Sequence, residues 1–161
     1  MKKNESLSEI KCVGITARTS NALEMNPETA KIGMTLQTYF SKGMPDKMSN
    51  RKNPGRTFAI YTKYESDEHG EYTYFLGEEV THFDDVAEGF ETLTMPAQNY
   101  AKFTTNPGAM PQVVIDMWQK IWKMNSEELN GKRSYIADFE IYDERAHDLQ
   151  NAVVDIYIGI K

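Results

Sequence analysis

The chain has 161 residues, of which 40% are hydrophobic and 26% are charged, and its formal net charge is −6. This length predicts one domain over residues 1–161, and the composition excludes a disordered chain and a membrane-embedded one. The negative charge disfavours direct binding to nucleic acid, because it repels phosphate backbones. A single cysteine, Cys12, and an N-terminus without an apolar leader segment favour a cytoplasmic protein.

The first half of the chain begins with an extended pattern and then a helical one. Residues 11–19, KCVGITART, favour a strand in which Cys12 is a small buried residue. Asn26-Pro27 predicts the start of a helix, with asparagine as the cap and proline at the first helical position. Apolar residues then recur at helical spacing until Gly43, so we expect one amphipathic helix between these points.

A hairpin completes this half. Residues 57–65 alternate apolar and polar side chains, which predicts a strand with one buried face. Residues 72–80 predict its return strand, with Tyr72 and Tyr74 on one face and Phe75 on the other.

The second half repeats this order of elements. Residues 90–105 are extended, and Pro96 interrupts them, which is typical of an edge strand or a broken strand. Pro111 predicts the start of a second helix, whose apolar stripe includes Trp118 and Trp122. Residues 134–143 and 152–161 then alternate as two further strands.

The order strand–helix–strand–strand therefore occurs twice, over about residues 10–81 and 90–161. Two such units can pair into one antiparallel sheet with both helices on one face, so we expect an α+β fold. The concave surface between the halves is a natural cleft for a ligand.

Five segments, in the same order along the chain, resemble the gyrase-inhibitor-like (GyrI-like) family of effector-binding domains. They are KCVGITART at 11–19, LTMPAQNYAKFTTNPG at 93–108, VIDMWQKIW at 114–122, DFEIYDERA at 138–146 and VDIYIGIK at 154–161. The sequence departs from the family in two places: Gly159 replaces a frequent proline, and Lys123-Met124 replaces the usual Leu-Pro pair after the second helix. The resemblance therefore does not imply the local shape of the pocket wall at this second position.

The resemblance implies two strand–helix–strand–strand repeats around a pocket for hydrophobic compounds, often cationic and drug-like. In many members this domain follows a DNA-binding domain of the AraC or MerR type. Only about ten residues precede the first expected strand here, which leaves no room for a helix-turn-helix. We therefore expect a stand-alone member of the family.

Glu140 is the foremost candidate for the binding site. Strand alternation places it on the same face as Tyr142, and either a solvent-exposed face or a pocket is consistent with that spacing. The resemblance implies a pocket, since the matching glutamate of the family faces one. A half-buried carboxylate among aromatic rings would attract a lipophilic cation, because the cation relieves the cost of burying the charge. The other candidates are aromatic residues that either line the pocket or pack in the core: Tyr142, Tyr157, Trp118, Trp122, Tyr61, Tyr72, Tyr74, Phe75 and Tyr100.

The sequence favours a binding protein for a small hydrophobic or cationic ligand. One alternative is a hydrolase of reactive xenobiotics, in which Glu140 acts with Tyr142 or Tyr157 on water or on the leaving group. Another is a module that binds a protein partner such as gyrase, or a homodimer. We expect no cofactor and no metal site, because the three histidines, His69, His82 and His147, fall in separate polar turns.

Overall fold

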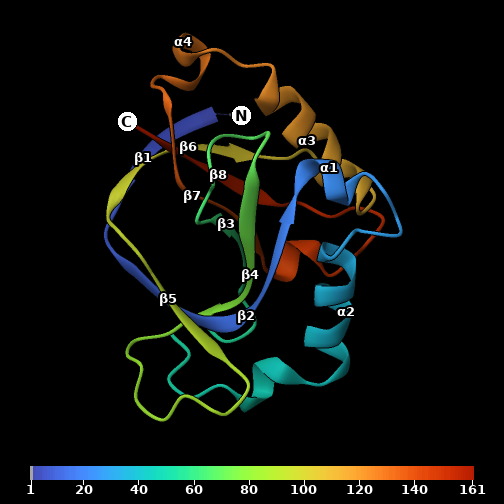
Figure 1. Cartoon of the computed structure of the whole chain (residues 1–161), viewed down its shortest axis with the longest axis vertical. Helices are drawn as coiled ribbons and strands as arrows, with labels where there is room; N and C mark the ends of the chain where they lie inside the picture. Colours follow the sequence, from blue (N-terminus) through green and yellow to red (C-terminus); the bar gives the residue numbers. More distant parts are fainter. Residues whose placement is uncertain (1) are drawn as a thin grey trace.

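The computed structural model describes residues 2–161 as one eight-stranded antiparallel sheet with helices on one side (Figure 1). The strands follow the order β1-β6-β8-β7-β3-β4-β2-β5 across the sheet. This confirms the expected α+β class with both main helices on one face. The strands are β1 (Lys2–Leu7), β2 (Ile10–Ser20), β3 (Thr57–Thr62), β4 (Glu71–Glu79), β5 (Glu91–Met95), β6 (Gln98–Thr104), β7 (Arg133–Tyr142) and β8 (Asp155–Ile160). The helices are α1 (Asn21–Glu24), α2 (Ile32–Ser41), α3 (Gln112–Trp122) and α4 (Ser126–Leu129), with short 3-10 turns η1 (Met44–Lys47) and η2 (Glu144–Ala146).

The two halves of the chain exchange their first strands. β1 pairs with β6 of the second half, and β5 pairs with β2 of the first half. Only residues 8–9 separate β1 from β2, and only residues 96–97 separate β5 from β6, so Pro96 marks the expected break. The first half therefore begins at β1 and not near residue 10, because β1 is the counterpart of β5.

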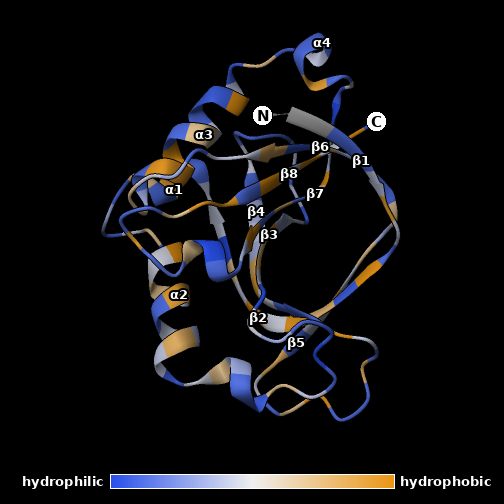
Figure 2. Cartoon of the chain, turned by 180° about the vertical axis from the view of Figure 1, so that it is seen from behind, coloured by the Kyte–Doolittle hydropathy of each residue, from blue (hydrophilic) through white to orange (hydrophobic). Residues whose placement is uncertain are grey.

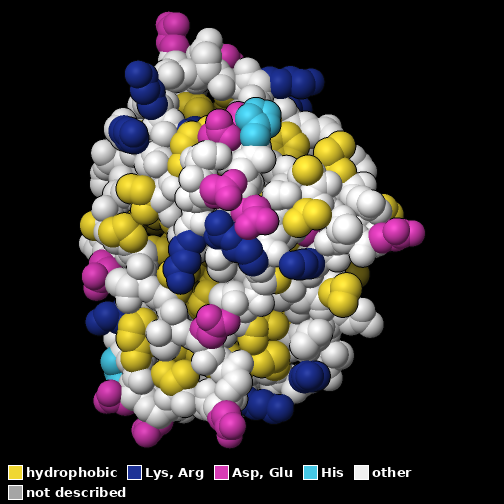
Figure 3. Space-filling view, viewed as in Figure 1, with side chains coloured by type: hydrophobic (Ala, Val, Ile, Leu, Met, Phe, Trp, Pro, Cys, Tyr) yellow, Lys and Arg dark blue, Asp and Glu magenta, His cyan; other side chains and the backbone are white. Residues whose placement is uncertain are grey.

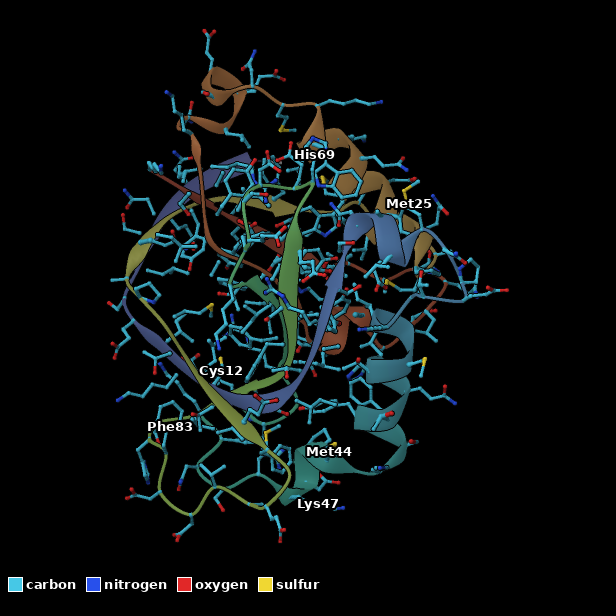
Figure 4. All side chains as sticks on the ribbon, viewed as in Figure 1. Cys12, Met25, Met44, Lys47, His69 and Phe83 are labelled. Atoms are coloured by element: carbon cyan, nitrogen blue, oxygen red, sulfur yellow. The ribbon has the colours of Figure 1, made fainter. Side chains whose placement is uncertain are left out.

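The sheet curls strongly, and its two faces bury different cores. The inner face of the curl encloses one apolar cluster that includes Cys12, Phe58 and Phe139. Cys12 is labelled on this inner side in Figure 4. The outer face is covered by α2 over β2–β4 and by α3 over β6–β8, each with its own apolar cluster. Both helices are amphipathic, with hydrophobic and hydrophilic residues alternating along them (Figure 2). Tyr61 and Tyr142 contact both outer clusters and so lie where the two helix layers meet.

The first helix differs from the prediction. Asn26 does not begin it; its side chain accepts a hydrogen bond from the Glu28 N–H at 3.0 Å in a local turn. The chain forms the short α1 before this turn and the longer α2 after it. The Glu24 carboxylate accepts hydrogen bonds from the N–H groups of Lys31 and Ile32. It therefore caps the free N–H groups at the start of α2, which is the role expected of Asn26.

β3 also differs from the prediction of one buried face. Five of its six residues are buried, because β3 lies between β7 and β4 with the curl interior on one side and the helices on the other. The alternation in the sequence reflects the change between two buried environments and does not mark a solvent-exposed side.

Within the described residues, no helix has the length and apolar character needed to cross a membrane. Charged side chains of both signs are distributed over the face seen in Figure 3, with hydrophobic side chains in small groups between them.

Candidate ligand-binding site

The centre of the site is Glu140, in the middle of β7. Alternation along this strand sends Phe139 and Ile141 into the curl interior and places Glu140 on the helix-covered face. Opposite Glu140 on β3 is Ala59, whose small side chain leaves room above the strand for larger neighbours. Only 2% of Glu140 is exposed, which is rare for a carboxylate.

Three neutral donors converge on this carboxylate. The Tyr61 hydroxyl donates to Oε2 at 2.7 Å, and the Trp118 indole N–H donates to the same oxygen at 2.6 Å. The Tyr142 hydroxyl donates to Oε1 at 2.5 Å. These donors come from β3, α3 and β7, so the sheet and its covering helix together hold the carboxylate in one position. We call Glu140, Tyr61, Trp118 and Tyr142 the Glu140 site.

Burial controls the electrostatics of this site. Removal from water raises the pKa of Glu140, and the hydrogen bonds from Tyr142, Tyr61 and Trp118 lower it by less, so the net direction is upward. Burial, and then the nearby Glu140, raise the pKa of Tyr61 and of Tyr142 well above the ordinary tyrosine value. The two tyrosines therefore remain protonated donors at neutral pH. An ionised Glu140 here is stabilised by dipoles and by no full positive charge among the contacts that the structure describes.

Aromatic rings extend outward from the Glu140 site on both sides. The Trp118 ring lies 5.2 Å from the Tyr61 ring, measured between centroids, and 6.2 Å from the ring of Trp122. On the other side of Tyr61, the rings of Tyr72 and Tyr74 lie at 5.4 and 5.5 Å. Trp122 is 44% exposed, so the row of rings runs from the surface to the buried carboxylate.

The structure thus brings together seven of the candidates named from the sequence: Glu140, Tyr142, Trp118, Tyr61, Tyr72, Tyr74 and, at the outer end, Trp122. Both tryptophans share one side of α3, as their spacing of four residues predicts.

Three other candidates are on the opposite face of the sheet. Phe75, Tyr100 and Tyr157 belong to the core inside the curl. Tyr157 stacks on Phe139 with centroids 4.5 Å apart, and Phe139 points away from its neighbour Glu140. The grouping of Tyr157 with Tyr142 is therefore corrected. Alternation in the sequence shows only that each tyrosine points to the opposite side of the sheet from the residues next to it in the chain. Which of the two sides the helices cover is not contained in that pattern.

Sequence reasoning missed a second buried carboxylate on the same face. Asp138 is two residues before Glu140 and is fully buried. It accepts hydrogen bonds from Tyr64 at 2.5 Å and from the Gly159 N–H at 2.8 Å, and it forms an ion pair with Arg133. Strand alternation from Glu140 was the signal that could have identified it.

The Glu140 site is closed in this structure. Two surface hollows of about 250 and 260 Å³ are lined mainly by polar residues near the strand ends, and neither includes Glu140. Of the three donors to Glu140, Tyr61 and Tyr142 are partly exposed, whereas Trp118 is buried. No group of three or more metal-ligating side chains is present among the described residues.

Comparison with known proteins points to one family. A family model described as Cass2, integron-associated effector binding protein, matches residues 5–160. The protein YobU of Bacillus subtilis (strain 168), which carries a provisional name as a transcriptional regulator, is 34% identical over 149 residues. These residues are 92% of this chain and 90% of YobU.

Two solved structures have the same fold. The integron cassette protein VCH_CASS2, from the mobile metagenome of Vibrio cholerae, superposes with a TM-score of 0.78 at 28% identity, covering 99% of this chain and 95% of the other. SAV2435, solved with bound tetraphenylphosphonium, also gives a TM-score of 0.78, at 17% identity, with 100% and 94% covered.

Proposed function

The chain belongs to the integron-associated effector-binding proteins, a GyrI-like family, and from this premise we propose that it binds a lipophilic monocation at the Glu140 site. The observation that carries this proposal is the environment of Glu140, a buried carboxylate that receives only neutral hydrogen-bond donors from the residues described around it. The tetraphenylphosphonium bound to SAV2435 supports the choice of a cationic, aromatic ligand class.

The energetics favour a cation over a neutral compound of the same shape. An ionised carboxylate that is removed from water without a full counter-charge is costly, and this cost is recovered when a cation enters. The faces of Tyr61, Trp118 and Tyr72 can add cation–π attraction of about 0.5–2 kcal/mol for each good contact. A strongly hydrated ammonium would lose more on leaving water, so the preferred cation spreads its charge under apolar groups.

Binding requires the Glu140 site to open. Because Glu140 is only 2% exposed, a ligand must displace some of the aromatic side chains that surround it. Tyr61 and Tyr142 are the partly exposed residues among its three hydrogen-bond donors, and each side chain can rotate about two bonds. We therefore propose that these rings turn aside and that the ligand takes over part of their contact with the carboxylate.

Tryptophan fluorescence tests this function directly. The chain has two tryptophans, Trp118 and Trp122, and the variant Trp122→Phe leaves Trp118 as the only reporter beside Glu140. Titration with tetraphenylphosphonium should change this signal with micromolar affinity, whereas neutral triphenylphosphine oxide should bind at least about 30-fold more weakly. Equal affinities for both compounds, or no binding of either below about 1 mM, would contradict the proposal.

The affinity for a permanent cation should also depend on pH. Burial raises the pKa of Glu140, and only the ionised carboxylate attracts the cation. Affinity should be constant above the raised pKa and then fall about tenfold for each pH unit below it. The neutral compound should show no such fall, and neither should the Glu140→Gln variant. A cation affinity that is flat down to pH 4 would show that Glu140 does not carry the interaction.

Hydrolysis of an electrophilic compound, binding to a protein partner and homodimer formation stay predictions from the sequence. No contact described in this structure favours one of them over capture of a small ligand.

A further inference from the structure

A second carboxylate with aromatic neighbours lies beside the Glu140 site, and it already holds a cation. The Arg133 guanidinium donates to Asp138 at 2.5 Å and stacks over the ring of Tyr135 at 4.4 Å from its centroid. The Tyr64 hydroxyl donates to the same Asp138 oxygen. Asp138 is fully buried and the Arg133 side chain is 10% exposed, so this ion pair is almost completely enclosed.

This cluster has the same components as the Glu140 site. Each has a buried carboxylate on the helix-covered face of β7, a tyrosine hydroxyl that donates to it from β3 or from just after β3, and an aromatic ring alongside. Tyr72 connects the two, with its ring 5.4 Å from that of Tyr61 and 5.9 Å from that of Tyr64. The difference is that Asp138 is neutralised by the protein's own arginine, whereas Glu140 has no such partner among its described contacts.

The backbone is shaped to hold Arg133 in this position. The β7–β8 register shifts between Arg133 and Asp138, and within that irregular segment Tyr135 has a φ of +54°. A large side chain rarely adopts this left-handed conformation, which costs about 1–3 kcal/mol. In this conformation the Tyr135 ring lies against the Arg133 guanidinium, and the Tyr135 hydroxyl donates a hydrogen bond to Glu68.

We propose that Asp138, Tyr64 and Tyr135 form a second cation subsite, which Arg133 fills, and that Arg133 thereby limits the protein to ligands with one positive charge. Without Arg133, the subsite takes a free alkylguanidinium, or the second charge of a short dication whose first charge is at Glu140. The subsite itself does not depend on Glu140. Its consequence for ligand choice rests on the proposed function.

The test is chemical rescue of the Arg133→Ala variant. Removing one partner of a buried ion pair should lower Tm by about 10 °C. Ethylguanidinium at millimolar concentration should recover at least half of this loss. If the variant is unfolded in buffer, recovery of its far-ultraviolet circular dichroism on adding ethylguanidinium is the same supporting result.

Three controls make the rescue specific. Arg145→Ala is the matched control, because Arg145 pairs with Asp143 and Asp155 but is 36% exposed, so its removal leaves no enclosed subsite. The double variant Arg133→Ala/Asp138→Asn removes both charges and should not respond. Arg133→Ala/Glu140→Gln should still be rescued, which separates this inference from the function of Glu140. Rescue of the Asp138→Asn double variant to the same extent, or no rescue of Arg133→Ala, would overturn the subsite.

Ligand choice is measured with 1,4-diguanidinobutane and butylguanidinium, because residues two apart on one face of a strand lie about 7 Å apart. The ratio of their affinities should rise at least tenfold in favour of the dication in Arg133→Ala relative to the unmodified protein. An unchanged ratio, with ethylguanidinium rescue intact, would overturn the role of Arg133 in selectivity.

Discussion

Replacing Glu140 with glutamine should stabilise the ligand-free protein and weaken cation binding at the same time. Glutamine can keep the geometry, because its oxygen can occupy the Oε2 position and accept from both Trp118 and Tyr61. Its amide nitrogen then donates to Tyr142, whose hydroxyl only has to rotate. The variant removes the buried charge and keeps one hydrogen bond to each of the three neighbouring side chains, so Tm near pH 8 should rise by about 3 °C, while the affinity for tetraphenylphosphonium should fall about 100-fold.

The stability difference between Glu140→Gln and the unmodified protein should depend on pH. The folded protein raises the pKa of Glu140, so the folded state binds the proton more tightly than the unfolded state does. The unmodified protein therefore loses stability as pH rises from the ordinary glutamate pKa, about 4.3, through the raised value. The glutamine variant does not titrate, so its advantage in Tm should vanish near pH 4 and grow upward through this window. A variant that is less stable than the unmodified protein at pH 8 would show that the buried carboxylate contributes to stability.

Gly14→Ala should cause a large loss of stability in the sheet. Gly14 of β2 faces Gly77 of β4 in register, and the strands approach closely there. A Cβ on Gly14 would lie 2.1 Å from the Leu76 carbonyl oxygen and 2.8 Å from the Gly77 Cα. Because backbone atoms of a paired strand cannot move aside, we expect a loss of about 3 kcal/mol in the free energy of unfolding, measured by urea denaturation.

Gly33→Ala is the matched control for this prediction. Gly33 is in α2, and a Cβ there would meet nothing within 4 Å. Alanine favours a helix over glycine by up to about 1 kcal/mol, so this variant should be slightly more stable. If Gly14→Ala unfolds at the same urea concentration as the unmodified protein, the close approach of β2 and β4 is not as described.

The fold could be predicted from the sequence because local patterns and pairing agree over most of its length. The hairpin of β3 and β4 and the final pair of β7 and β8 appear as alternating segments, and Pro96 marks the break between β5 and β6. β1 was missed, because its sequence KKNESL is polar and has no apolar alternation. It is an edge strand whose position depends on pairing with β6 of the other half, a contact that no local pattern records.

The candidate site was predictable only in part. Glu140 stands out because a glutamate between Phe139 and Ile141 conflicts with the usual preference of a central strand. The side of the sheet that each tyrosine faces was not readable, since both faces are buried and alternation alone cannot assign them. Tyr157 and Tyr100 were therefore grouped with the site but pack inside the curl. The Arg133–Asp138 ion pair depends on a shift in the β7–β8 register between these two residues. Regular strand alternation therefore could not predict it from the sequence.

The claim that the Glu140 charge anchors a cationic ligand is tested most directly by a double-mutant-type thermodynamic cycle, in which the charge of the ligand and the charge of residue 140 are each removed. The four affinities are measured by titration calorimetry. Tetraphenylphosphonium and neutral triphenylphosphine oxide are each titrated into the unmodified protein and into Glu140→Gln at pH 8. The cycle compares the loss of affinity for the cation with the loss for the neutral compound, which cancels changes in shape and stability. We predict a coupling free energy of about 2–3 kcal/mol between the two charges. A coupling near zero would contradict the assignment of Glu140 as the anchor.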